Sequence, residues 1–220
     1  MMLDGNLARR QLQAAGKYMM DHGLAWGNSG NISVRTGDDR YVITGSGTFL
    51  GELADEDFVE CTFAGRTFPE GRKASKEMPM HRAVYEMRPE IGAVLHASPF
   101  YATLFACAQE EITSLLFVET MYYLERVERV PYFHPGSEAL GDAVREKAAK
   151  ANVLLLENHG VLVYDTSVRE AQMALHTLET ACRMILTSRS AGVPLSRMAP
   201  QTASDFLQNA GYKQRREWRE

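Results

Sequence analysis

The chain has 220 residues, of which 45% are hydrophobic, and this is enough to bury a sizeable core in one large domain or two small ones. Its net charge is −4 and it has no basic segment, which argues against nucleic-acid binding and means that any anion must be held locally, by backbone amides and hydroxyl groups. Widely spaced Cys61, Cys107 and Cys182 predict reduced thiols, and the lack of a signal-peptide core or an apolar run of roughly 20 residues predicts a cytoplasmic protein without membrane contact.

The first half of the chain alternates between helical and extended patterns. Apolar residues recur at helical spacing within residues 6–21, and Gly23 follows as a stop. A polar glycine loop then leads into two strands, and the turn at residues 37–39 between them predicts a hairpin. The strands are expected at 32–35, 41–44 and 56–62, and the next helix at 77–87.

The second half continues this alternation. Strands are expected at 91–96, 112–119, 153–156 and 161–163, the last two forming a hairpin, and helices at 100–108, 137–150 and 167–189. From about residue 196 the tail is polar, and we expect no regular element there. Because no repeat and no Pro/Gly/Ser-rich linker divides the chain, we predict a single domain over residues 1–220 with an α/β or α+β sandwich architecture.

Two histidines follow apolar strands. His96 comes directly after the run at 93–95, and His159 closes the segment that begins at 154. Strand ends in layered α/β folds are where functional sites gather, because the strand fixes the backbone and the next loop opens outward. Glu77 lies in a polar segment just before the helix at 77–87. The residue pattern alone leaves two interpretations open, structural histidines and a metal site.

Three short loops are rich in hydrogen-bond donors: GNSGN at 27–31, GSG at 45–47 and ASK at 74–76. Glycine lets backbone amides approach an anion closely, and Asn, Ser and Lys side chains supply further donors. Each loop by itself is typical of a plain turn. Together, and without a Walker motif, they indicate a phosphate pocket of another type.

These motifs have a fixed order along the chain: GNSGNISVR at 27–35, ITGSG at 43–47, SKE at 75–77, AVLH at 93–96, PYFHPGS at 131–137 and NHG at 158–160. In this order and spacing the chain resembles the class II aldolase/adducin family over about residues 6–190. The resemblance implies a three-layer α/β/α sandwich around a mostly antiparallel sheet. It also implies a homotetramer with active sites between subunits.

The resemblance further implies roles for individual residues. His96 and His159 correspond to ligands of a divalent metal, with zinc as the expected ion. Glu77 corresponds to the acid/base glutamate, which can also contact the metal. The expected pocket for a substrate phosphate consists of Asn28, Asn31, Ser46, Gly47, Ser75 and Lys76. The reaction implied is the cleavage of a carbon–carbon bond in a small sugar phosphate through a metal-stabilised enediolate, as in a metal-dependent aldolase.

One metal position departs from the family pattern. The family has His-x-His after the apolar strand, whereas this chain has His96-Ala97-Ser98, and a serine hydroxyl is a poor zinc ligand beside imidazole. Three outcomes are open. Glu77, His96 and His159 can form the site with water, Glu119 can serve as a third protein ligand, or the site binds metal weakly or not at all. We favour the first.

The position of the catalytic proton donor also departs from the family pattern. Phe117 stands where the family aldolase has a tyrosine, and a phenyl ring cannot donate a proton. Tyr122 and Tyr123 follow closely, but packing is the more common role for such residues. The resemblance suggests Tyr212, in the tail, as a catalytic residue, and His134 is a further local acid with a structural or surface role as its alternative.

Several functions are compatible with these residues. The leading hypothesis is a metal-dependent aldolase. A decarboxylase or an epimerase on the same scaffold would need the same metal, so the sequence separates them poorly. A non-catalytic, adducin-like interaction domain is the third possibility, but it should lose the metal residues, and Glu77, His96 and His159 are all present.

Overall fold

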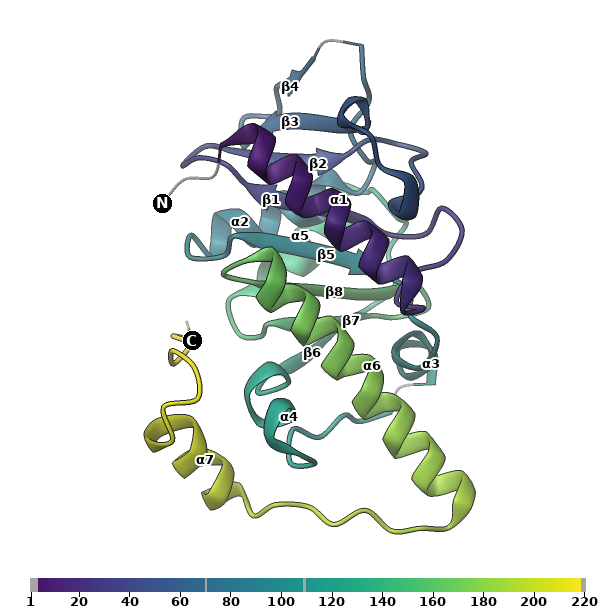
Figure 1. The fold of residues 1–220 in the computed structure, drawn as a ribbon, viewed down its shortest axis with the longest axis vertical. Coiled ribbons are helices and arrows are strands. Elements are labelled where there is room, and N and C mark those ends of the chain that lie inside the picture. The colour runs from purple at the N-terminus through teal and green to yellow at the C-terminus, as the bar shows by residue number, and fades with distance from the viewer. Residues whose placement is uncertain (1–3, 70, 109, 219–220) are drawn as a thin grey trace.

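The computed structural model describes residues 4–69, 71–108 and 110–218, which form a central sheet with helices on both faces (Figure 1). The strands are β1 (Asn31–Arg35), β2 (Arg40–Thr44), β3 (Phe58–Thr62), β4 (Thr67–Phe68), β5 (Ala93–Ala97), β6 (Val127–Val130), β7 (Val153–Leu156) and β8 (Gly160–Asp165). They form one eight-stranded sheet in the order β4-β3-β2-β1-β5-β8-β7-β6. The β6–β7 pair is parallel and the other pairs are antiparallel, so the predicted mostly antiparallel sheet is confirmed.

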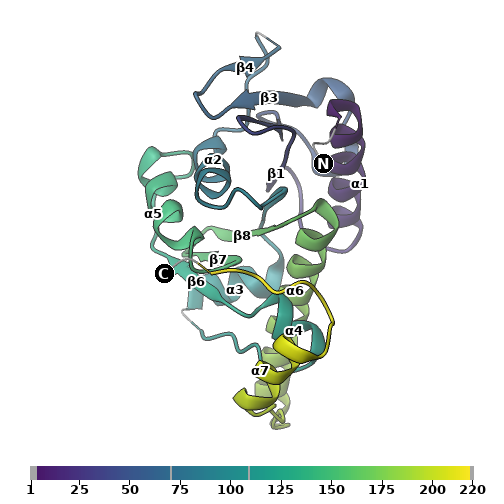
Figure 2. The same ribbon diagram turned by 90° about the vertical axis from the view of Figure 1, so that its left-hand side faces the viewer.

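The helices form two outer layers. They are α1 (Gly5–Asp21), α2 (Met78–Met87), α3 (Phe100–Ala108), α4 (Val118–Tyr123), α5 (Glu138–Ala148), α6 (Val168–Ala191) and α7 (Pro200–Asn209), with short 3-10 turns at Leu50–Glu52 and Asp55–Asp57. In Figure 2 α1 and α6 lie on one side of the sheet, and α2 and α5 lie on the other. Each side has its own cluster of buried apolar residues, so the predicted three-layer α/β/α arrangement is confirmed.

The central strands explain why the sequence shows continuous apolar runs there. In β5 every residue is buried, and the side chains alternate between the two clusters: Leu95 packs with α1 and α6, whereas Val94 packs with α2 and α5. A strand covered on both faces needs apolar residues at successive positions, not at every second one. Because His96 is two residues after Val94, this alternation turns its side chain toward the α2 side of the sheet.

Three segments differ from the sequence-based expectation. The run at 112–119 is not a strand: α4 begins at Val118, and its first turn is closed by Thr120, whose hydroxyl accepts from the amide of Phe117 at 3.0 Å. Residues 112–117 form an irregular segment, and from there Ile112, Leu116 and Phe117 pack against the core. The edge strand β6 and helix α7 were not expected, because Val-Glu-Arg-Val has a weak strand pattern and the tail is polar.

Other expectations are met. Ser137 accepts a hydrogen bond from the Leu140 amide at 3.1 Å and so caps α5. Cys61, Cys107 and Cys182 are free thiols. Within the described ranges, none of the helices is both long enough and apolar enough to span a membrane.

Candidate active site

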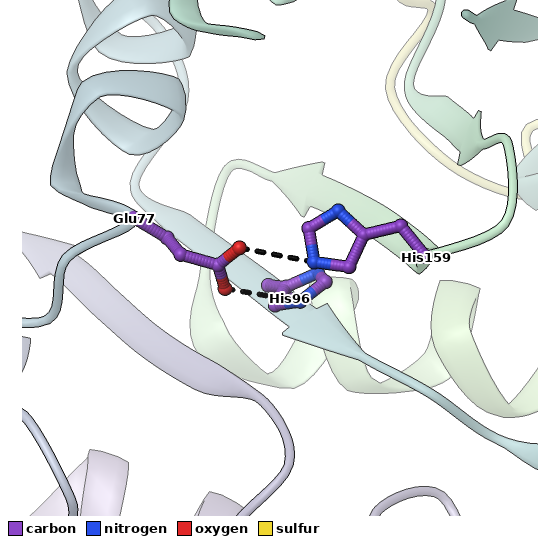
Figure 3. Close-up of side chains that lie close together, drawn as sticks. All are labelled: Glu77, His96 and His159. Atoms are coloured by element: carbon purple, nitrogen blue, oxygen red, sulfur yellow. Dashed lines mark ion pairs between the residues drawn. The ribbon is translucent and has the colours of Figure 1, made fainter. Parts of the chain in front are cut away.

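Three side chains from separate parts of the sequence meet at one edge of the sheet (Figure 3). Glu77 directly precedes α2, where Pro79 in the first turn favours the start of a helix. His96 lies in β5, and His159 lies in the turn between β7 and β8. One possible ligand atom from each residue lies within 4.8 Å of the other two.

The turn that carries His159 has an unusual backbone. Asn158 has a φ of 54°, in the left-handed region that asparagine tolerates better than most residues. Next to it, Gly160 lies so close to β5 that a Cβ there would be 2.6 Å from the Ala97 carbonyl oxygen. The missing side chain lets the turn lie against the end of β5. As a result the rings of His159 and His96 make an edge contact, with centroids 4.7 Å apart.

The atoms of Glu77, His96 and His159 that face one another are atoms that can bind a metal ion. Nε2 of His159 lies 3.0 Å from Oε1 of Glu77, and Nε2 of His96 lies 3.1 Å from Oε2. Nδ1 of His96 is 3.0 Å from the main-chain oxygen of Val161, to which it must donate. In a neutral ring this leaves the lone pair on Nε2, facing the carboxylate. A lone pair and a carboxylate in contact repel each other unless a positive charge lies between them, so these residues fit a cation.

Burial strengthens this argument. His96 is 2% exposed and Glu77 9%. Burial lowers the pKa of His96, and the nearby Glu77 charge offsets this in part, so the ring is neutral near pH 7. Burial also raises the pKa of Glu77, but the interactions of its carboxylate with the nearby His96 and His159 rings and with Asn31 outweigh this effect and lower the pKa to about 2. An ionised carboxylate beside neutral imidazole is a donor set for a divalent metal.

The structure also shows where the alternative ligands lie. Among the described residues, the group that can hold a metal consists of Glu77, His96 and His159. Glu119, on α4, does not join it. The Ser98 hydroxyl, 3.4 Å from the main-chain oxygen of His159, is committed to the backbone of the turn. The structure therefore assembles the first of the three ligand sets considered above.

A cavity of about 520 Å³ lies over these three residues. Residues of the three loops that the sequence marked as donor-rich line it. The loops at 45–47 and 74–76 are joined where the Ser46 amide donates to the Lys73 carbonyl at 2.9 Å and the Ser75 amide to the Thr44 carbonyl at 3.0 Å. All six residues expected to bind phosphate line the cavity: Asn28, Asn31, Ser46, Gly47, Ser75 and Lys76. The cavity thus places the expected phosphate pocket directly beside the expected metal site.

Asn31 has partners that the sequence did not suggest. Its Nδ2 donates to Oε2 of Glu77 at 2.6 Å, and its Oδ1 lies 2.7 Å from Nε2 of His81. His81 is fully buried on α2 and was absent from the predicted site. The signal that could have revealed it is its spacing of four residues from Glu77, which puts both on one face of a helix.

Tyr212, expected as a catalytic residue, and the other residues considered as proton donors lie away from the cavity. Tyr122 donates to the main-chain oxygen of Gln214 at 3.0 Å and Tyr123 to Glu170 at 2.9 Å, and both rings are buried in the core. Tyr212 packs its ring against Tyr122, with centroids 5.9 Å apart. Neither these tyrosines nor His134 line the cavity, and among the described residues no tyrosine does.

Comparisons with known proteins show the family of this chain. Residues 10–186 match the family described as "Class II Aldolase and Adducin N-terminal domain". The 3-oxo-tetronate 4-phosphate decarboxylase of Haemophilus influenzae is 29% identical over 211 residues, which are 94% of this chain and 99% of that protein. The L-fuculose phosphate aldolase of Methanocaldococcus jannaschii is 28% identical over 170 residues, covering 77% of this chain and 91% of that protein.

Solved structures show the same fold. The crystal structure of YgbL from Klebsiella pneumoniae superimposes with a TM-score of 0.81 at 29% identity, over 92% of this chain and 99% of that one.

Proposed function

Because this chain belongs to the family of class II aldolase and adducin N-terminal domains, we propose that it is a metal-dependent carbon–carbon lyase acting on a small sugar phosphate. The observation that carries the proposal is the convergence of Glu77, His96 and His159 beneath a cavity walled by donor-rich loops. These three residues would hold a divalent metal, for which we propose zinc. A bound ion supplies a Lewis acid for the negative charge that develops on the substrate oxygens.

The cavity wall suits a phosphate group. Gly47 has a φ of 79° with open space around its Cα, so its backbone amide can approach an anion. Ser46 and Ser75 add hydroxyl groups, and Lys76 adds the positive charge that a chain of net charge −4 must provide locally. Holding the phosphate would orient the reacting carbon toward Glu77.

Glu77 is the group that would move a proton at the substrate carbon. Its Oε2 accepts from Asn31 at 2.6 Å, whereas Oε1 is buried and faces Nε2 of His159 at 3.0 Å. The lowered pKa keeps the carboxylate ionised at neutral pH and able to accept a proton.

Within this class we favour decarboxylation of a 3-oxo sugar-acid phosphate. When a 3-oxo acid loses CO2, the electron pair of the broken bond passes to the carbon next to the carbonyl, and the substrate then takes up one proton. For decarboxylation, Glu77, which is ionised at rest, would take this one proton from water and pass it to the carbon. Aldol cleavage also needs a group for the proton of a substrate hydroxyl, and among the described residues no tyrosine lines the cavity to take it. The names of several relatives point the same way.

Aldol cleavage is the second candidate. Tyr212 is 37% exposed, so in the expected homotetramer it can contact a neighbouring subunit. A tyrosine that enters the site from another subunit would restore the missing proton donor. The homotetramer, the cytoplasmic location and the roles of the individual residues remain predictions.

The test offers two substrates to the zinc-loaded enzyme. 3-Oxo-tetronate 4-phosphate would give dihydroxyacetone phosphate and CO2, and L-fuculose 1-phosphate would give dihydroxyacetone phosphate and an aldehyde. We expect triose phosphate and CO2 from the first substrate. Triose phosphate from the second alone would make the protein an aldolase, and no triose phosphate from either would refute the proposed lyase.

Two controls tie the activity to the site. Glu77→Gln should abolish turnover, whereas Glu56→Gln, at an exposed glutamate remote from the cavity, should leave it unchanged. His159→Ala should lose both the metal and the activity. Less than about a tenth of an equivalent of metal in wild-type protein purified without chelator would contradict the metal site.

A further inference from the structure

We propose that Asn31 is a positioning residue that orients the carboxylate of Glu77, and that a buried chain of His81, Ser33 and Tyr85 holds Asn31 in place. The inference rests on the proposed role of Glu77 as metal ligand and base. It adds to the site three side chains that lie beneath the cavity wall and cannot touch a substrate there.

The chain of contacts is continuous. Nε2 of His81 lies 2.7 Å from Oδ1 of Asn31, and Nδ1 of His81 lies 2.7 Å from the hydroxyl of Ser33. The Ser33 hydroxyl in turn lies 2.8 Å from that of Tyr85. Asn31 is 7% exposed, Tyr85 1%, and Ser33 and His81 are fully buried. Solvent therefore does not compete for these hydrogen bonds.

The spacing of these residues along β1 and α2 brings their side chains together. Asn31 and Ser33 are two residues apart on β1, so their side chains leave the sheet on one face. Glu77, His81 and Tyr85 are four residues apart and share one face of α2. Where this face of the helix meets this face of the strand, the polar side chains interleave between Glu77 at one end and Tyr85 at the other.

The donor and the acceptor of each hydrogen bond in this network can be assigned by starting from Glu77. An ionised carboxylate only accepts, so Glu77 takes a hydrogen from Nδ2 of Asn31, and Oδ1 of Asn31 must then accept from Nε2 of His81. A neutral His81 has its lone pair on Nδ1, which accepts from Ser33. Burial lowers the pKa of His81 to about 3, which keeps the ring neutral. Ser33 then accepts from the Tyr85 hydroxyl.

This assignment gives the two oxygens of Glu77 different tasks. Asn31 holds Oε2, whereas Oε1 receives no hydrogen bond from Asn31 and faces His159 at 3.0 Å, where it would contact a metal or a proton. It also limits the role of Asn31 in phosphate binding, because Oδ1 and one hydrogen of Nδ2 are already committed. Without His81 the Asn31 amide could rotate about its last side-chain bond and turn its oxygen toward the carboxylate, where two acceptors would repel each other.

The test compares His81→Leu with His81→Gln. Leucine has a similar volume but no hydrogen bond, whereas glutamine can still donate to Asn31. We expect His81→Leu to weaken binding of Zn²⁺ alone, measured by calorimetry, by about 10- to 100-fold, and to lower kcat by a similar factor with KM nearly unchanged. His81→Gln should recover most of both. His22→Leu, at an exposed histidine, is the matched control.

Each result has a distinct meaning. If His81→Leu folds and keeps wild-type zinc affinity and kcat, the inference is overturned. A rise in KM with kcat unchanged would also overturn it, because Asn31 would then serve phosphate binding. If His81→Leu does not fold, Ser33→Ala, which removes the partner of Nδ1, should show the same losses to a smaller degree, and wild-type values there would overturn the inference. If wild-type protein turns over neither substrate while His81→Leu loses zinc affinity, the proposed function fails but the positioning role stands.

Discussion

Buried His81 should make the metal-free protein sensitive to mild acid. In the folded protein, burial, together with the charge of His96, lowers the pKa of His81 to about 3, from 6.5 for an exposed histidine. The unfolded chain therefore binds more protons between these two pH values. The stability linked to His81 is fully present above about pH 6.5 and is lost as the pH falls toward 3.

The size of the effect follows from these two values. At pH 5 protonation favours the unfolded state by a factor of about 30, which corresponds to about 2 kcal/mol of the free energy of unfolding. At pH 8 the same effect is close to zero. A loss of this size is a large fraction of the stability of a typical domain.

Urea unfolding of chelator-treated protein at pH 8, 7, 6 and 5 measures this loss. His81→Gln is the reference, because glutamine does not titrate and the remaining ionisable groups are common to both proteins. Between pH 8 and pH 5 the wild type should lose about 2 kcal/mol more than His81→Gln. A difference below about 0.5 kcal/mol would show that His81 is hydrated or already charged in the folded state, and the assignment of its hydrogen bonds would then be wrong.

Three further changes test other parts of the structure. Ser98→His places an imidazole at the position where the family has one, and should tighten zinc binding about tenfold or more in a competition with a chelator; unchanged affinity would mean that position 98 does not face the metal. Arg216→Ala leaves Asp165 buried without its charge partner, and urea unfolding should show a free energy of unfolding lower by about 3–5 kcal/mol. A loss below about 1 kcal/mol would show that this ion pair is no stronger than one on the surface. Gly160→Ala forces its Cβ against β5 and should displace the turn of His159, so that zinc binding falls even where the protein stays folded; wild-type affinity would show that the turn can adjust.

The fold could be predicted where the pattern had one interpretation. β5, β7 and β8 are buried on both faces, so their apolar runs are continuous and unambiguous. The region from 112 to 130 was not predictable in this way. Residues 112–117 form an irregular segment before α4, whose first turn Thr120 closes through its own hydroxyl, and β6 is an edge strand with charged residues at its centre. Such local hydrogen bonds leave no periodic trace in the sequence.

The site shows a different limit. Glu77, His96 and His159 could be named because each stands at a loop or strand end and matches a family motif, and the structure brings them together. The orientation of the Asn31 side chain could not be predicted from the sequence. Asn31 belongs to a glycine-rich loop in the sequence, which suggested phosphate, but it is also the first residue of β1, and the strand turns it toward α2. Only the packing of strand on helix decides between these interpretations.

In the sequence, Ser98 at a position where the family has a metal-binding histidine argued against a metal site. The geometry of the site removes this objection. Three protein ligands leave open positions on a divalent ion, and catalytic metal sites, unlike structural ones, keep such positions for water or substrate. Glu77, His96 and His159 already converge without a contribution from position 98, and the Ser98 hydroxyl is directed to the backbone of the His159 turn. With serine in place of histidine, a bound metal would have one protein ligand fewer and would keep one more position open for a substrate. This is the outcome expected for a site that binds its substrate through the metal.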